Sequence, residues 1–127
     1  MSHAPALDWV SQLFAAIDAK DVEGFLAFLA PAARFRYGSG PAAVGHAQIG
    51  EAARAFFATL DHIEHHLDFT ARIADRIIAE GRVVYHLPDS RVIELPFANI
   101  MRTGESGLIE NYRIYIDPTP LSSHAKQ

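Results

Sequence analysis

His66 and Tyr85, a histidine and a tyrosine nineteen residues apart in the second half of the chain, could together do acid–base chemistry. An imidazole with a pKa of about 6.5 exchanges a proton at neutral pH, and a phenol can stabilise an oxygen that gains negative charge. In one cavity, they would supply a proton carrier and a group that holds the substrate oxygen. The alternative, a hydrogen-bonded core or interface histidine and a packing tyrosine, stays open because perturbed groups also serve structure.

Asn99 and Tyr37 are further polar candidates that could polarise or orient a ligand oxygen. The amide of Asn99 can donate a hydrogen bond without any change of protonation. Strand alternation predicts that it shares a face with apolar residues, which would line a cavity with it. These are Ile93, Leu95, Phe97 and Met101. The alternative for Asn99 is a buried amide that satisfies nearby backbone groups.

The run from Asp61 to Asp68 is the most metal-like segment of the sequence. On a helix, His62 would share a face with His65 or with His66. No third ligand is assigned, so the run is interpreted as the solvated end of a helix, and no metal site is predicted. Gly38-Ser39-Gly40 lacks the third glycine and the strand-to-helix context of a phosphate-binding loop, and it predicts a turn.

Composition limits the remaining chemistry and the partners. The 127 residues carry a net charge of -4 with Lys and Arg scattered singly, so nucleic acid is not an expected partner. The absence of cysteine excludes thiol nucleophiles, disulfides and thiolate metal sites. No signal peptide or membrane-spanning run is evident, which predicts a cytoplasmic protein without membrane contact.

Hydrophobic periodicity predicts helices in the first half of the chain. Apolar residues at spacings of three and four indicate helices over 7–20, 22–29 and 49–60, of which the third fades through 61–65. Pro31 ends the second helix. A short strand is expected over 34–37, followed by a turn-rich loop that ends near Gly45.

Everything after the third helix has the composition of strands. Val, Ile, Phe and Tyr are frequent in four runs separated by short breaks, which implies antiparallel neighbours. The predicted strands span 66–73, 77–87, 91–102 and 108–117. Gly81 predicts a bulge, and Pro96 predicts a bulge or an unpaired edge. The tail over 118–127 is polar and expected to be loose.

This order of elements predicts an α+β fold: one domain over 1–127, with a core over about 7–121. Three helices would pack on one face of a strongly bent, mostly antiparallel sheet. Such a cone, lined by Phe, Leu and Ile with a few polar groups, has the general shape of a site for a small apolar molecule.

Four segments together resemble the nuclear transport factor 2-like superfamily and, within it, the SnoaL-like branch. They are the helix pair ending in Asp18-Ala19-Lys20-Asp21-Val22-Glu23, the segment from Phe35 to Gly45, the helix with Phe56-Phe57, and the ending from Gly107 to Asp117. The resemblance implies a cone with an apolar cavity and a homodimer. The superfamily includes ketosteroid isomerases, limonene epoxide hydrolases and polyketide cyclases, so the fold alone does not determine the reaction.

The resemblance also places particular residues. Asn99 falls where ketosteroid isomerases hold a protonated aspartic acid, whereas Leu13 replaces their oxyanion tyrosine and Arg36 or Tyr37 replaces their base. Against the epoxide hydrolase pattern, Tyr37 replaces a water-positioning asparagine and Ile114 replaces the carboxylate that activates water. Asp117 matches an acidic position of many relatives, to which the resemblance assigns no role.

SnoaL-like relatives imply that His66 and Tyr85 both reach the cavity. The leading hypothesis is therefore a cofactor-independent acid–base enzyme of isomerase, cyclase or epoxide hydrolase type. It would act on a small apolar carbonyl or epoxide compound, with His66, Tyr85, Asn99 and Tyr37 as catalytic residues. The expected ligand-binding residues are Phe35, Phe56, Leu95, Phe97, Met101 and Ile114.

Two alternatives without chemistry remain open. The first is a binding module with the same cavity, motivated by the missing carboxylates. The second is an interaction protein whose outer sheet face forms a dimer or receives a partner. On the predicted strand phase, that face would carry Val92, Glu94, Ala98 and Ile100.

Overall fold

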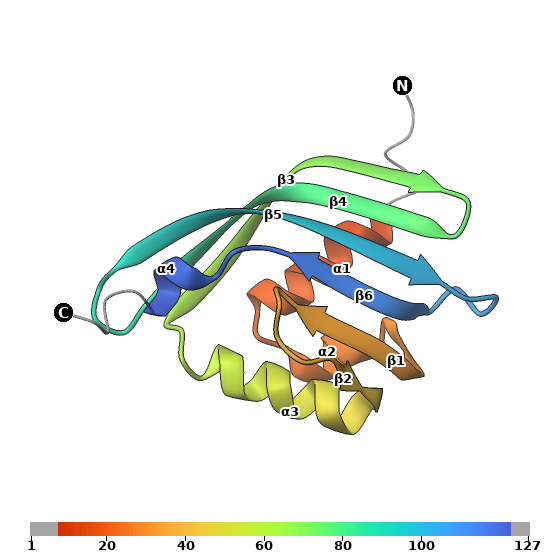
Figure 1. Ribbon diagram of the computed structural model, residues 1–127, viewed down its shortest axis with the longest axis horizontal. Helices are drawn as coiled ribbons and strands as arrows, with labels where there is room; N and C mark the ends of the chain where they lie inside the picture. Colours follow the sequence, from red (N-terminus) through yellow and green to blue (C-terminus); the bar gives the residue numbers. More distant parts are fainter. Residues whose placement is uncertain (1–7, 123–127) are drawn as a thin grey trace.

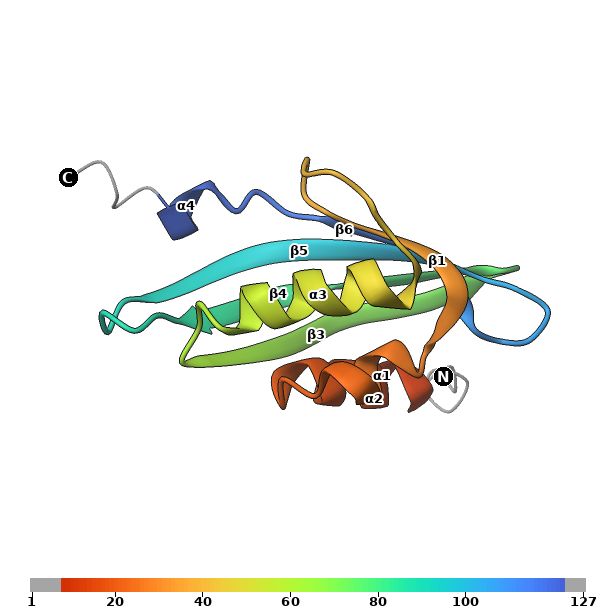
Figure 2. The same ribbon diagram turned by 90° about the horizontal axis from the view of Figure 1, so that it is seen from below.

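Residues 8–122, described by a computed structural model, form a six-stranded sheet with helices across one face (Figure 1). The elements are α1 (Asp8–Asp18), α2 (Val22–Leu26), β1 (Leu29–Tyr37), β2 (Ala43–Val44), α3 (Gly45–Phe57), β3 (His62–Ile73), β4 (Arg76–His86), β5 (Val92–Thr103), β6 (Ile109–Tyr115) and α4 (Thr119–Ser122). Viewed from below, α1, α2 and α3 all lie on the same side of the sheet (Figure 2). The predicted α+β class is confirmed.

The sheet is open, and its strand order is β2-β1-β6-β5-β4-β3. All neighbouring strands are antiparallel except β1 and β6, which run parallel and pair Phe35 with Tyr112 and Tyr37 with Ile114. This parallel pair brings the first strand of the chain beside the last one. Within residues 8–122, no helix has both the length and the apolar character to span a bilayer.

The helices follow the predicted periodicity, with different ends. α2 ends at Leu26 rather than at residue 29, because Leu29 already begins β1, which contains Pro31. α1 buries Val10, Leu13 and Phe14, whereas Leu7, the predicted start of this helix, lies outside the described residues. The side chain of Asp21 caps α2 by accepting a hydrogen bond from the backbone N–H of Gly24 at 3.0 Å.

α3 begins at Gly45 rather than at Ile49, where the predicted helix starts. Gln48 Oε1 accepts the backbone N–H of Val44 at 2.8 Å and so satisfies a free amide at the start of the first turn. The sequence pattern missed this turn because it contains no apolar stripe.

β3 begins at His62, so the prediction of a fading helix over 61–65 is wrong. The long β3–β4 pairing extends to this end, where His62 lies opposite His86 and the backbone N–H of Asp61 donates to the His86 carbonyl at 2.8 Å. Alternation along a strand turns neighbouring side chains to opposite faces. His62 and His66 therefore share the outer face of the sheet, whereas Ile63 and His65 face the helices.

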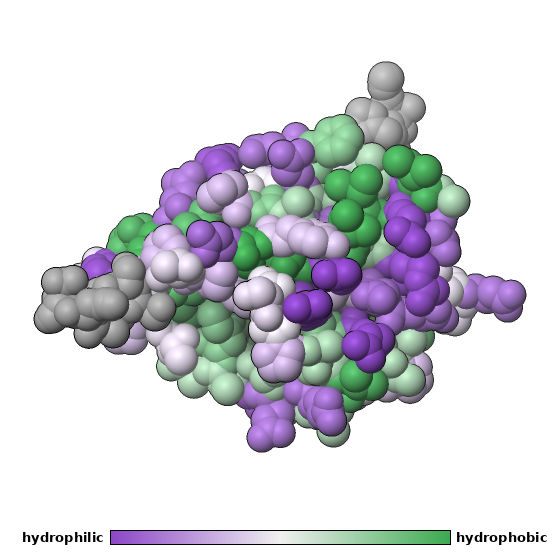
Figure 3. Space-filling model, in the orientation of Figure 1, coloured by the Kyte–Doolittle hydropathy of each residue, from purple (hydrophilic) through white to green (hydrophobic). Residues whose placement is uncertain are grey.

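A bulge interrupts β3 opposite Gly81. The register shifts between Leu67 and Phe69, and a Cβ at position 81 would lie 2.0 Å from the carbonyl oxygen of His66. The extra residue reverses the phase of the strand, which leaves Phe69 and Ile73 exposed. Figure 3 shows hydrophobic surface over this end of β3 and β4, among hydrophilic side chains.

The remaining features lie further along the chain. Pro96 pairs with Arg82 of β4 without a register shift and lies beyond the last β6 partner, so it occupies an unpaired edge. Val92 and Glu94 are exposed on the outer face. Residues 119–122 form α4, which corrects the expectation of a loose tail for this part, and residues 123–127 lie outside the described range.

We expect Gly81→Ala to destabilise the fold by about 1–3 kcal/mol, because the added methyl group meets backbone that cannot rotate away. Urea unfolding measures the change. Gly40→Ala is the matched control, since its Cβ would be 3.4 Å from the nearest atom, the carbonyl oxygen of Tyr37. Equal stability of the two variants would contradict the close approach at Gly81.

Candidate functional site

An apolar cavity of about 190 Å³ lies between the three helices and the sheet. Every strand except β2 contributes to its wall, as do α1, α2 and α3. Most of the wall is aromatic or aliphatic, and the polar groups are few. The lining residues with polar atoms are Tyr37, His65, Tyr85, Asn99 and Tyr112.

His65 is held in this wall by Asp18, the last residue of α1. One carboxylate oxygen accepts the backbone N–H of His65 at 2.9 Å, and the other lies 2.6 Å from the imidazole Nδ1. A carboxylate only accepts hydrogen bonds, so Nδ1 carries a hydrogen and, in the neutral ring, Nε2 is an acceptor. Asp18 thereby fixes the tautomer of His65 as well as its position.

Two aromatic rings hold the imidazole plane. Phe14 lies 4.9 Å and Phe97 5.3 Å from its centre, and the His65 side chain is only 11% exposed. Within residues 8–122, Nε2 makes no hydrogen bond to the protein. It is therefore available to a molecule in the cavity.

Tyr37 and Tyr85 form a second polar group in the wall. Their hydroxyl oxygens lie 2.9 Å apart, so one phenol donates to the other and the second keeps a hydrogen that it can donate to a ligand. Phe56 packs against both rings. Burial raises the pKa of Tyr85, and the neighbouring Tyr37 raises it further. Burial also raises the pKa of Tyr37, so both phenols are protonated at neutral pH.

Asn99 and Tyr112 form a third polar group. Asn99 Nδ2 donates to the Tyr112 hydroxyl at 3.1 Å, and burial raises the pKa of this tyrosine. Asn99 is 1% exposed, and its Oδ1 is the one buried side-chain acceptor in the described structure without a partner. An unpaired buried acceptor costs free energy, and Asn99 bears this cost at the wall of the cavity.

The structure places most of the predicted site residues in the cavity wall, and their chemical roles stay predictions. Those in the wall are Tyr37, Tyr85, Asn99, Phe35, Phe56, Phe97 and Ile114. Leu95 and Met101 share the buried face of β5 with Phe97 but belong to the hydrophobic core instead. They lie on either side of the short stretch of β5 that reaches the cavity.

His66 does not reach the cavity, so the expectation of a His66 and Tyr85 pair in one site is corrected. It lies on the outer face of β3 opposite Arg82, its side chain is 44% exposed, and its Nε2 contacts Glu64 Oε2 at 2.9 Å. Tyr85 faces the other way and pairs with Tyr37. The strand that contains both histidines turns only His65 inward.

Two residues of the site were missed from the sequence. For His65 a signal was present, because Ile63, His65 and Leu67 alternate with polar residues and would have predicted a buried face had the strand been started at His62. For Asp18 the signal was weaker. A carboxylate at a helix C-terminus opposes the helix dipole, which hints that another contact holds it there.

The chain matches the SnoaL-like domain family over residues 10–112. It belongs to this family. No curated protein matches the chain significantly. The family agrees with the open six-stranded sheet and the helices across one of its faces.

Solved structures show the same fold for this SnoaL-like chain. A nuclear transport factor 2-like protein of unknown function from Burkholderia pseudomallei has a TM-score of 0.82 at 20% identity, covering 90% of this chain and 92% of that chain. TerC, co-crystallised with polyporic acid, has a TM-score of 0.82 at 17% identity, and the match covers 97% of this chain and 99% of TerC. A protein named as a SnoaL-like polyketide cyclase from Jannaschia sp. has a TM-score of 0.78 at 15% identity, and the match covers 90% of this chain and 86% of that chain.

The buried phenols predict a specific loss of stability in alkali. The pKa of Tyr85 is higher in the folded than in the unfolded chain. Its contribution to the free energy of unfolding is therefore complete below the ordinary pKa of about 10 and decreases as the pH rises beyond it. In Tyr85→Phe the free energy of unfolding should decrease less steeply above pH 10, by up to about 1.4 kcal/mol per pH unit. Urea unfolding at a series of pH values measures the slope.

Below pH 9 the free energy of unfolding of Tyr85→Phe and of the parent protein should change with pH in the same way, which serves as the internal control. The same alkaline slope in Tyr85→Phe and the parent protein would show that this phenol is not buried in the folded chain.

Proposed function

We propose that the protein is a cofactor-independent acid–base enzyme for a small apolar carbonyl or epoxide compound bound in the cavity. The observation that carries the proposal is the Asp18–His65 pair, whose Nε2 is left available inside an apolar wall. A base positioned by a second group is the arrangement that proton transfer requires. His65 takes the role that the sequence analysis gave to its neighbour His66.

In the proposed reaction, His65 moves the proton and the Tyr37–Tyr85 pair stabilises the charge on the substrate oxygen. Nε2 of His65 takes a proton from carbon beside the carbonyl, or from water that attacks an epoxide, and later returns it. Meanwhile the oxygen of the substrate gains negative charge and accepts a hydrogen bond from the free hydroxyl of the Tyr37–Tyr85 pair. This hydrogen bond strengthens in the apolar cavity, because little water screens it.

Cavity size and the free acceptor narrow the substrate class. An apolar cavity of about 150 Å³ admits benzene, so the volume of about 190 Å³ fits one substituted ring. Asn99 lines the wall, and its unpaired Oδ1 would accept a hydrogen bond from a ring hydroxyl once a small rotation of the side chain exposes it. TerC, which shares the fold, was co-crystallised with polyporic acid, which supports a small-molecule ligand for this chain as well.

A binding module without turnover is the second candidate. It is favoured by one observation: no Asp or Glu side chain lines the cavity within residues 8–122. Ile114 does line it, at the position where the resemblance to epoxide hydrolases implies a carboxylate. Both candidates share the ligand and differ in product formation.

Two neighbouring histidines on opposite faces of β3 allow a matched test. A set of hydroxylated single-ring ketones, aldehydes and epoxides is first screened by thermal shift, since a ligand at about 100 times its Kd stabilises the fold by about 2.7 kcal/mol. Product analysis on stabilising compounds follows. His65→Gln should lower kcat by about 10²–10⁴-fold, whereas His66→Gln should leave it unchanged.

Stabilisation without product would support the binding module instead. Equal rates for His65→Gln and His66→Gln would remove His65 from the mechanism. If none of these compounds stabilised the protein, the proposed ligand class itself would be wrong.

A further inference from the structure

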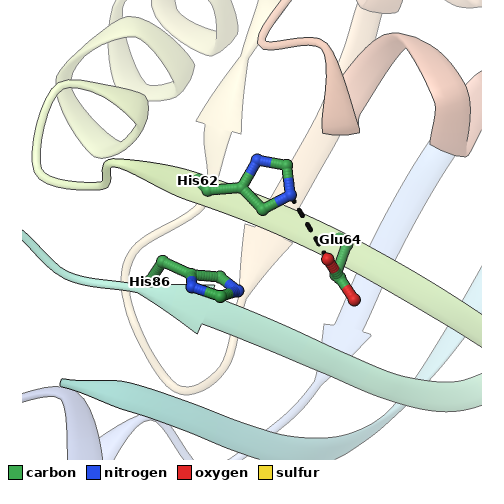
Figure 4. Close-up of side chains that lie close together, drawn as sticks. All are labelled: His62, Glu64 and His86. Carbon is green, nitrogen blue, oxygen red and sulfur yellow. Dashed lines mark hydrogen bonds and ion pairs between the residues drawn. The ribbon is translucent and has the colours of Figure 1, made fainter. Parts of the chain in front are cut away.

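Three side chains of types that can ligate a metal lie close together on two neighbouring strands (Figure 4). His62 and Glu64 lie on β3, and His86 lies on β4 as the direct cross-strand partner of His62. Residues 62 and 64 share a face because side chains alternate along a strand, and the cavity residue His65 points to the other face. The cluster is thus separate from the proposed active site.

The three side chains already converge. His62 Nε2 lies 3.2 Å from Glu64 Oε1, and the rings of His62 and His86 are 5.1 Å apart. One ligand atom from each residue lies within 4.8 Å of the other two. Ligand atoms bound to one zinc ion at about 2.0–2.2 Å stand about 3.3–3.6 Å from one another in a tetrahedron. Small side-chain rotations therefore close the set around an ion, and exposed His62 has room for them.

We propose that His62, Glu64 and His86 bind a divalent transition-metal ion, with Zn²⁺ as the best fit. Two imidazoles and one carboxylate suit zinc, whereas Mg²⁺ and Ca²⁺ prefer sites built of oxygen atoms alone. Three protein ligands leave a coordination position for water or another small ligand. The side chains of His62 and Glu64 are 56% and 41% exposed, so this position is open to solvent.

His66 supports the cluster from its second side. Its Nε2 contacts Glu64 Oε2 at 2.9 Å, which leaves Oε1 turned toward His62. Partners of this kind orient metal-binding carboxylates in known sites. The exposed histidine that the sequence analysis assigned to catalysis would thus position a metal ligand.

Glu94 provides a matched control, because it lies on the same outer face and outside the cluster. Glu64 pairs with Val84 and Val84 pairs with Glu94, so the two carboxylates flank one residue in register. Glu64→Gln and Glu94→Gln make the same chemical change on the same surface. Only the first removes a proposed ligand.

Calorimetric titration of the full chain, without an added histidine tag, with ZnCl₂ tests the proposal. The parent protein and Glu94→Gln should each bind one zinc ion per chain. Glu64→Gln and His86→Gln should weaken binding at least about tenfold, since even outer partners of metal ligands contribute that much. Visible absorption of bound Co²⁺ should appear in the parent protein and be lost in His86→Gln.

Thermal melting without metal checks that each variant is folded. Because Glu64→Gln and His86→Gln remove different ligands, the test can still be read if one of them does not fold. The proposal is overturned if the parent protein shows no saturable binding, or if Glu64→Gln and His86→Gln bind zinc as well as Glu94→Gln does. The cavity experiment has separate variants and readouts, so failure of either proposal leaves the other standing.

Discussion

The carboxylate of Asp18 makes two contacts with His65, and these join the end of α1 to β3 at the wall of the cavity. The backbone contact fixes the strand against the helix, and the side-chain contact fixes the imidazole. Without the second contact the ring could carry its hydrogen on either nitrogen, and the cavity would lack an oriented proton acceptor. Phe14 and Phe97 pack beside the ring and limit its movement.

Alternation along β3 gives this strand two distinct chemical faces. The inner face carries His65 into an apolar cavity, and the outer face carries His62, Glu64 and His66 into solvent. Neighbouring histidines thus meet opposite environments. The bulge opposite Gly81 ends this phase and exposes the next apolar residue, Phe69, so the two faces are defined only over the first half of the strand.

Much of the fold could be predicted because the spacing of apolar residues and the turn residues between elements can be read from short stretches of sequence. The buried stripe of α1 and the alternation of Leu95, Phe97 and Asn99 both follow from spacing alone. The start of β3 could not, because polar residues at His62 and Glu64 look like a helix end until the pairing with β4 is known. A predicted strand that begins at His66 leaves His65 outside it, although His65 is the histidine that lines the cavity.

The site was harder to predict than the fold, because its contacts join distant segments. Asp18 and His65 meet only once α1 has packed over the sheet, and Tyr37 meets Tyr85 only because β1 runs beside β6. Which buried residues line a cavity and which fill the core is also a property of packing. Met101 and Asn99 share one strand face, yet only Asn99 reaches the cavity.

Nitrogen NMR of the histidine side chains reports which ring nitrogen of His65 carries the hydrogen. We expect hydrogen on Nδ1 of the neutral ring, held by Asp18, and a bare Nε2 whose signal shifts when a ligand enters the cavity. Hydrogen on Nε2 of the neutral ring, or a signal that no cavity ligand moves, would show that Asp18 does not orient a proton acceptor there.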